Sequence, residues 1–247
     1  MNIKKLLLLL MIFLTIGSSF TDCKEVCFVI DNFEDRNYNF NPEWFQFGDC
    51  QLNIKNNLEK TAQQYFREKD YFNALITGVS SLFFNPSINK AELRKLGYYS
   101  LQITGMGQNW YLGGIGTYLG IDLTPYNAVS MYVKGNRKNS GRLKIELFDD
   151  DANRWTIVGE TGFDKWVYEL NINWVGWKRV IIPFSDFKLE NKGCGDGIWN
   201  PFQVGKSGGL IQLQLVALTS QKFQKSRVDF QLDEMYFIRS LGGRRKS

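Results

Sequence analysis

The sequence predicts an all-β domain, a β-sandwich of the jelly-roll type, and three observations predict it. Short segments in which apolar and polar residues alternate dominate from residue 98 onward. Turn-forming residues, such as Gly135-Asn136 and the segment 149–153, separate these segments. No helix-periodic segments lie between them, which favours two packed antiparallel sheets over a parallel α/β sheet.

The alternation is clearest in 142–148, where Leu143, Ile145 and Leu147 point one way and Lys144 and Glu146 point the other. Successive side chains of a strand point to opposite faces, so one face of each such segment is expected to be buried. By the same spacing, the aromatic residues at 166 and 168 share a face. Further strands are expected at 26–30, 98–104, 128–134, 155–159, 166–170, 177–182, 210–218 and 229–238.

One stretch departs from this pattern. The segment 57–69 is polar and helix-friendly, and Leu58, Ala62, Tyr65 and Phe66 share one helical face. The segment 56–95 as a whole is too short and too polar to have a core of its own. We therefore expect a partly helical insertion on the edge of the sandwich rather than a second domain.

The N-terminus has the features of a secretory signal peptide over residues 1–19. Lys4 and Lys5 precede an apolar run at 6–16, and small residues follow at 17–19. The run is shorter than the roughly 20 residues that a membrane-spanning helix needs, and an uncleaved membrane anchor is the alternative. The sequence thus predicts an exported protein (secreted, periplasmic or at the cell surface), with a sandwich at 20–240 and a basic tail at 241–247. Loss of both lysines lowers the formal net charge from +5 to +3, too little to indicate nucleic-acid binding.

Cysteine and histidine usage limits the possible chemistry. Cys23, Cys27, Cys50 and Cys194 allow two disulfides in three connectivities, and Cys23 could instead be a lipidated N-terminal residue. The chain has no histidine, which excludes Ser-His-Asp and Cys-His sites and the usual zinc hydrolase sites. An enzyme here would need carboxylate, Lys or Tyr chemistry. The main catalytic alternative is a glycoside hydrolase using Glu146 with Asp149 or Glu169.

Two local motifs each have a functional and a structural interpretation. The glycine-rich segment 105–120 carries Trp110 and Tyr111, which could stack on sugar rings or complete the core. Four oxygen-bearing residues have the spacing of an EF-hand calcium loop, but Arg154 replaces the required glycine and the flanks are strand-like. A hairpin tip that could hold a cation weakly is the better interpretation. These residues are Asp149, Asp151, Asn153 and Glu160.

Several segments together resemble family-11 carbohydrate-binding modules and the related complex I intermediate-associated proteins, both galactose-binding-like jelly rolls. The segments are 31–35 with Trp44, 98–105 with Trp110-Tyr111, Trp166-Val167-Tyr168, the run Trp177 to Phe187, and 228–235. The resemblance implies a concave sheet face that binds a β-glucan chain, and often a structural Ca²⁺ between the first and last strands.

The resemblance also implies roles for individual residues. Trp110 or Tyr111 would stack on sugar, Asp164 would bind a hydroxyl group, and Val216 stands where the family has a stacking tyrosine. The expected carbohydrate-binding set is Trp110, Tyr111, Asp164, Trp199, Gln212 and Gln214, and the expected calcium ligands are Asp31, Glu34 and Asp233.

The sequence therefore leads to a secreted, non-catalytic carbohydrate-binding module for a β-glucan-type polysaccharide. A protein-interaction or assembly scaffold of the cell envelope is the main alternative, favoured by Val216 and by the insertion at 56–95. A component of a glucan-degrading hydrolase is the third. None of these involves nucleic acid, and contact with a membrane would come only through an N-terminal anchor.

Overall fold

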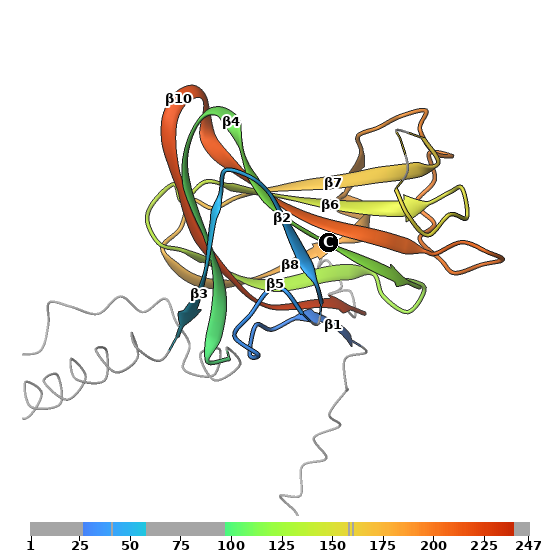
Figure 1. Ribbon diagram of the computed structural model, residues 1–247, viewed down its shortest axis with the longest axis horizontal. Coiled ribbons are helices and arrows are strands. Elements are labelled where there is room, and N and C mark those ends of the chain that lie inside the picture. Colours follow the sequence, from blue (N-terminus) through green and yellow to red (C-terminus); the bar gives the residue numbers. More distant parts are fainter. Residues whose placement is uncertain (1–26, 41, 58–96, 158, 160, 240–247) are drawn as a thin grey trace, which may run out of the picture.

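Two antiparallel sheets pack face to face as a sandwich, which confirms the predicted fold class (Figure 1). This computed structural model describes residues 27–40, 42–57, 97–157, 159 and 161–239. The predicted signal peptide, the insertion beyond Asn57 with its helix, and the basic tail lie outside the described residues. No helix formed by the described residues is both long enough and apolar enough to cross a membrane.

The first sheet has the strand order β2, β4, β10, β6, β7, β9. These strands span Trp44–Gly48, Tyr99–Ile121, Leu210–Ile238, Arg142–Asp150, Phe163–Asn171 and Lys188–Leu189. The second sheet joins β3 (Gln51–Asn56), β4, β10, β5 (Ala128–Gly135) and β8 (Gly176–Pro183), and β1 (Cys27–Asp31) pairs with the end of β10. A short 3-10 helix, η1, covers Phe184–Asp186.

The strands β4 and β10 are long enough to run through both sheets. They pair with each other from Leu210↔Ile121 to Leu232↔Leu101, with register shifts between Ala217 and Ser226. Such irregularities bend a strand pair and increase its twist. The predicted segments 210–218 and 229–238 are therefore two halves of one bent strand, each in a different sheet.

The core is formed by the inward-facing residues of both sheets. Leu143, Ile145 and Leu147 are fully buried, as the alternation predicted. Phe33, Phe230 and Phe237 are the largest side chains that the core buries completely. Each such ring contributes roughly 2–3 kcal/mol of transfer free energy, so the sandwich is held mainly by apolar burial.

The predicted strand at 155–159 is wrong. Among its described residues, 155–157 and 159, none is in a strand. Trp155 has a φ of 60°, its backbone N–H donates to Asp150 Oδ2 (3.1 Å), and its indole N–H donates to the Lys206 carbonyl oxygen (2.8 Å). These hydrogen bonds stabilise a turn at Trp155 in place of β-strand pairing. The strands β2 and β3 were not predicted as separate elements.

The described cysteines do not pair. Cys27, Cys50 and Cys194 are free thiols, so the two-disulfide arrangement that the sequence allows is not formed. Burial raises the pKa of the Cys50 thiol, which keeps it protonated among core residues. Cys23 lies outside the described residues.

Candidate functional site

The first sheet has one face that points away from the core, which we call the outer face. Leu213 and Leu215 of β10 point into the core, so Gln212, Gln214 and Val216 point to the outer face. Phe148, Glu146 and Lys144 of β6 pair with these three positions, and Tyr118, Gly116 and Gly114 of β4 pair with them from the other side. The outer face thus joins an aromatic side to a charged side.

Three rings form what we call the aromatic strip: Phe47, Phe45 and Tyr118. The centroids of Phe45 and Phe47 are 6.1 Å apart, and those of Phe45 and Tyr118 are 5.4 Å apart. Phe45 pairs with Gly116, where an added Cβ would overlap the Phe45 ring, so glycine lets this ring lie close to the sheet. Tyr118 remains 62% exposed. The strip therefore offers aromatic surface to solvent.

Tyr111 and Trp110 lie at the end of the outer face. Tyr111 is 52% exposed and pairs with Leu218. Partial burial raises the pKa of its phenol, and the negative charges of Glu146 and Asp49 act in the same direction, so the hydroxyl stays a hydrogen-bond donor. The guanidinium of Arg142 lies 5.0 Å from the centre of the Trp110 ring.

A network of ion pairs covers the charged side of the outer face. Lys144 Nζ lies 2.7 Å from an oxygen of Glu146 and 2.7 Å from one of Glu190, and Lys165 Nζ lies 2.6 Å from Glu190. Burial lowers the pKa of Lys144, but its hydrogen bonds to both glutamates outweigh this and raise it. Lys144 is therefore charged at neutral pH, and the N–H groups and carboxylates of the network are suited to bind hydroxyl groups.

The sequence-predicted carbohydrate residues lie in three different places. Trp110, Tyr111, Gln212 and Gln214 share the outer face, where Gln214 is half-buried and Gln212 is buried. Asp164 lies two residues before Trp166, on the core side of β7, and is fully buried at the end of the sheet. It is not near the glutamines, because side chains of opposite faces do not meet.

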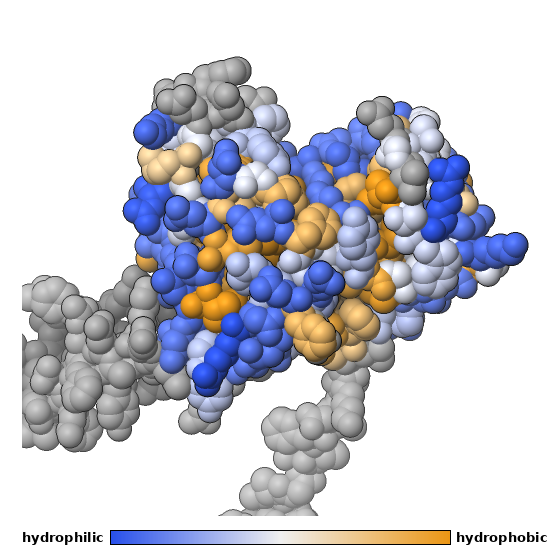
Figure 2. Space-filling model, in the orientation of Figure 1, coloured by the Kyte–Doolittle hydropathy of each residue, from blue (hydrophilic) through white to orange (hydrophobic). Residues whose placement is uncertain are grey.

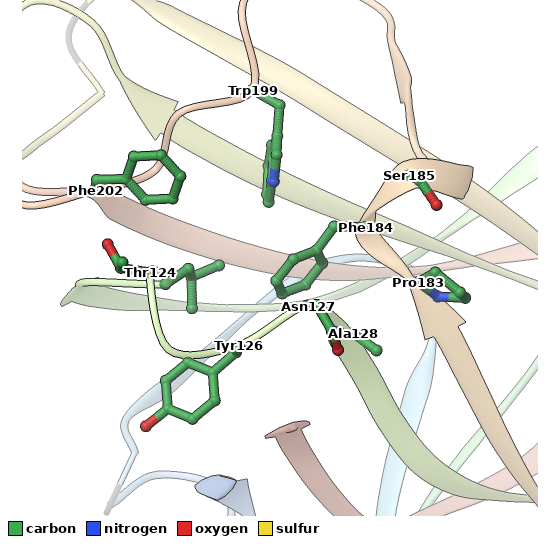
Figure 3. Close-up of a pocket in the computed structure, with 10 residues that line it drawn as sticks. Thr124, Tyr126, Asn127, Ala128, Pro183, Phe184, Ser185, Trp199 and Phe202 are labelled. Atoms are coloured by element: carbon green, nitrogen blue, oxygen red, sulfur yellow. The ribbon is translucent and has the colours of Figure 1, made fainter. Parts of the chain in front are cut away.

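Trp199 lines a separate pocket of about 380 Å³ at one end of the sandwich (Figure 3). Its ring packs on Trp166, 5.6 Å between centroids, and on Phe184, 5.1 Å between centroids. Tyr126 and Phe202 also border this pocket, which is largely apolar. The apolar character of this pocket distinguishes it from the polar outer face.

The expected calcium ligands also have different surroundings. Asp233 is fully buried, and burial together with the charges of Glu234 and Glu34 raises its pKa to about 8. Asp31 is already satisfied by the protein, since Phe33 N–H and Trp44 Nε1–H donate to its two oxygens at 2.7 Å each. Both oxygens of Asp233 also accept hydrogen bonds, from Glu234 N–H at 2.8 Å and from Asn57 Nδ2–H at 3.2 Å, and Glu34 Oε1 accepts one from Tyr99 N–H at 2.8 Å.

The carboxylates of the hydrolase alternative do not form a catalytic pair. Glu146 is paired with Lys144, and Glu169 with Arg142 at 3.1 Å. Asp149 stands an odd number of residues from Glu146 on β6 and lies on the opposite side of the strand. Among Glu146, Asp149 and Glu169, therefore, no general acid faces a second carboxylate.

Sequence reasoning missed the aromatic strip. Phe45 and Phe47 alternate with buried Trp44, which was a readable signal that both rings share the outward face. Tyr118 lies in the glycine-rich segment 105–120 but was not among the expected carbohydrate-binding residues. On the side shown in Figure 2, hydrophobic patches lie among hydrophilic residues, and the surface is hollowed between two lobes.

No family model and no curated protein matches the sequence. Three carbohydrate-binding modules are among the solved structures that resemble the chain. A family 11 module from Clostridium thermocellum, in complex with a β-1,3-1,4-mixed-linked tetrasaccharide, is 14% identical, with a TM-score of 0.47 over 88% of this chain and 98% of that one. The CBM22-1 xylan-binding domain from Paenibacillus barcinonensis Xyn10C is 15% identical, with a TM-score of 0.36 over 81% and 87%. TmCBM61 in complex with β-1,4-galactotriose is 12% identical, with a TM-score of 0.39 over 85% and 96%.

Proposed function

We propose that the outer face of the first sheet binds a carbohydrate chain without catalysing its cleavage. The observation that carries this proposal is the aromatic strip, which lies beside a row of glutamine, lysine and glutamate side chains on one sheet face. Flat rings stack on the apolar C–H faces of sugars, and the polar row can bind the hydroxyl groups at the sugar edges.

The ligand class that fits this arrangement is an extended β-glucan-type polysaccharide. An extended chain of β-linked sugars presents flat apolar faces in succession, and the Phe47, Phe45 and Tyr118 rings follow one another at 6.1 and 5.4 Å with their planes tilted by 42° and 37°. Gln214 lies on the strand next to the ring of Tyr118, within reach of equatorial hydroxyl groups. Tyr111, with a protonated hydroxyl, extends the row at its end.

The proposal includes export and a structural calcium ion. The charged, apolar and small-residue segments of positions 1–19 support a signal peptide. Glu34, Asp233 and Glu234 would hold Ca²⁺ near the end of β10, where Glu234 was not among the expected ligands. The ion would neutralise three neighbouring carboxylates and so stabilise the second sheet.

The test is affinity electrophoresis of the mature protein in gels that contain soluble β-glucan, xylan or mannan. We expect retardation in the β-glucan gel. The variant Tyr118→Ala should bind about 5- to 150-fold more weakly, because an exposed stacking ring contributes about 1–3 kcal/mol. Tyr98→Ala is the matched control, since Tyr98 is a similarly exposed tyrosine (59%) outside the first sheet.

Two outcomes would contradict the proposal. One is the absence of retardation in all three gels. The other is equal loss of binding in Tyr118→Ala and Tyr98→Ala, which would show that the outer face is not the contact. Recovery of one stoichiometric protein partner, unaffected by added sugar, would instead support the envelope scaffold.

A further inference from the structure

Four aspartates meet at one end of the first sheet, away from the outer face. They come from the end of β6, the start of β7 and the loop that follows β9, and we call them the aspartate cluster: Asp149, Asp151, Asp164 and Asp196. One carboxylate oxygen from each of Asp151, Asp164 and Asp196 lies within 4.8 Å of the others. Asp149 on β6 pairs with Asp164 on β7, which places Asp149 beside the other three aspartates.

The buried oxygens of this cluster lack donors. Asp149 and Asp164 are 0% exposed, and Oδ1 of each has no hydrogen-bond partner. Asp151 Oδ2 is buried and unpartnered as well. Within the described part of the chain, no lysine or arginine forms an ion pair with any of the four. Burying a carboxylate oxygen without a hydrogen-bond donor or a cation costs free energy. The unpartnered oxygens therefore indicate a binding partner beyond the protein's own groups.

Backbone amides hold the other oxygens of the same carboxylates. Gly197 N–H donates to Asp164 Oδ2 at 2.6 Å, and Asn200 N–H donates to Asp149 Oδ2 at 2.9 Å. Each carboxylate is thus oriented by the loop through one oxygen, while its second oxygen is left for something else. Orienting hydrogen bonds of this kind are typical of metal ligands.

The electrostatics of the aspartate cluster also favour a bound cation. Burial raises the pKa of Asp149 to about 8, with the charges of Asp151, Asp164 and Asp196 acting in the same direction. Burial and the charges of Asp164 and Asp196 raise the pKa of Asp151 to about 6. A bound cation would remove this mutual repulsion.

The backbone of Gly195 passes directly against the unpartnered oxygens. A Cβ added at Gly195 would overlap Asp151 Oδ2 and Asp164 Oδ1. The loop can therefore close over the cluster only because this residue has no side chain. A methyl group at this position would occupy the space between the oxygens without changing any charge.

We propose that the aspartate cluster binds a calcium ion. Carboxylate oxygens are hard ligands, and ligand oxygens on opposite sides of Ca²⁺ are about 4.6–5.2 Å apart, whereas those around Mg²⁺ are about 4.2 Å apart. Oxygens that all lie within 4.8 Å of one another can share one Ca²⁺ ion, and a set of four carboxylates favours Ca²⁺ over Mg²⁺, which is usually held by one or two carboxylates and keeps several waters. The ligand set differs from the EF-hand spacing in the sequence, because Asp164 and Asp196 take the places that Asn153 and Glu160 would have had.

The ion would fasten the loop of residues 190–201 to the sheet. Trp199 of this loop packs on Trp166 and forms part of the wall of the 380 Å³ pocket. Calcium at the cluster therefore fixes the shape of that pocket. This inference is independent of carbohydrate binding on the outer face.

The test is thermal unfolding and isothermal titration of the chelator-treated protein with CaCl₂ or MgCl₂. We expect Ca²⁺ to raise the melting temperature by about 5 °C or more at a hundredfold excess over its Kd, and Mg²⁺ to have a smaller effect. The calcium site near the end of β10 is removed by using an Asp233→Asn background, so the remaining shift reports the cluster alone.

Two variants in that background decide the result. Asp164→Asn and Gly195→Ala should both lose the calcium-induced shift and the binding heat. Asp164→Asn should melt in chelator at the same temperature as its parent or higher, which separates loss of a ligand from a failure to fold. Equal calcium binding in parent and both variants would overturn the proposal, as would the absence of any calcium shift in the parent. Tryptophan fluorescence that changes with Ca²⁺ in the parent only would support the link to Trp199.

Discussion

Asp31 and Asp164 are both buried aspartates at strand ends, and their surroundings are opposite. Two donors of the protein, Phe33 N–H and Trp44 Nε1–H, satisfy both oxygens of Asp31. Asp164 has a donor for one oxygen only, and its second oxygen faces other carboxylates. The difference teaches that burial alone does not distinguish a structural carboxylate from a ligand. The number of hydrogen-bond donors around each carboxylate oxygen makes that distinction.

The largest effect is expected for Asp31→Ala. Removing the carboxylate leaves two buried donors, on Phe33 and Trp44, without an acceptor, which should cost about 3 kcal/mol or more of unfolding free energy. Urea denaturation at pH 7 measures this. Asp35→Ala, at an exposed position nearby, is the control and should change stability by less than about 0.5 kcal/mol. Equal effects of the two substitutions would show that Asp31 is not the structural acceptor.

The pH dependence of Asp31 gives the next effect. Burial raises its pKa from 3.8 to about 6, although the hydrogen bonds from Phe33 and Trp44 oppose the shift. The folded state therefore keeps a proton that the unfolded chain has released. The stability from this group is complete below about pH 4 and is lost as pH rises through 6, about 3 kcal/mol in total. The stability difference between wild type and Asp31→Asn should fall across this range, and a difference independent of pH would contradict the shifted pKa.

The opposite sign is expected for Asp149→Asn in the presence of chelator. An asparagine can still accept from Asn200 N–H, and it removes one charge from a group of buried carboxylates. Stability at pH 8 should remain the same or rise by about 1 kcal/mol. Guanidinium denaturation in EGTA measures this effect. A loss comparable to that of Asp31→Ala would mean that the cluster is a structural network and not a ligand set.

The smallest effect is expected for Glu190→Gln, a carboxylate that lysines already satisfy. Burial raises the pKa of Glu190, but the hydrogen bonds from Lys144 and Lys165 outweigh this and lower it. Because Glu190 is partly exposed, its loss should cost about 0.5 kcal/mol. The cost should shrink in 1 M NaCl, where the Debye length is about 3 Å. If salt does not change this stability cost, the ion pairs of Glu190 are shielded from solvent and do not lie on the exposed outer face.

Much of the fold could be predicted, because alternation determines which face of a strand is buried. Leu143, Ile145 and Leu147 show this, and so does the pair Trp166 and Tyr168, which packs against the core. The segment 155–159 failed because Asp150 supplies acceptors that stabilise a turn there. Alternation does not record such local side-chain acceptors.

The candidate sites were predicted only in part. Alternation could have placed Asp164 beside Trp166 on the core side, and could have found Phe45 and Phe47. Asp149 and Asp151 were noticed together because their spacing resembles that of an EF-hand calcium loop. Their contact with Asp164 and Asp196 depends on strand pairing and on the path of a loop, which one sequence does not specify.

Because β4 and β10 belong to both sheets, the two sheets are continuous with each other through these strands. Opening either sheet breaks backbone ladders that also hold the other. Gln214 on the outer face and Asp233 beside Glu34 belong to the same strand. We therefore expect ligand occupancy at one end of that strand to slow the solvent exchange of amides at the other, and the domain to melt as a single cooperative unit.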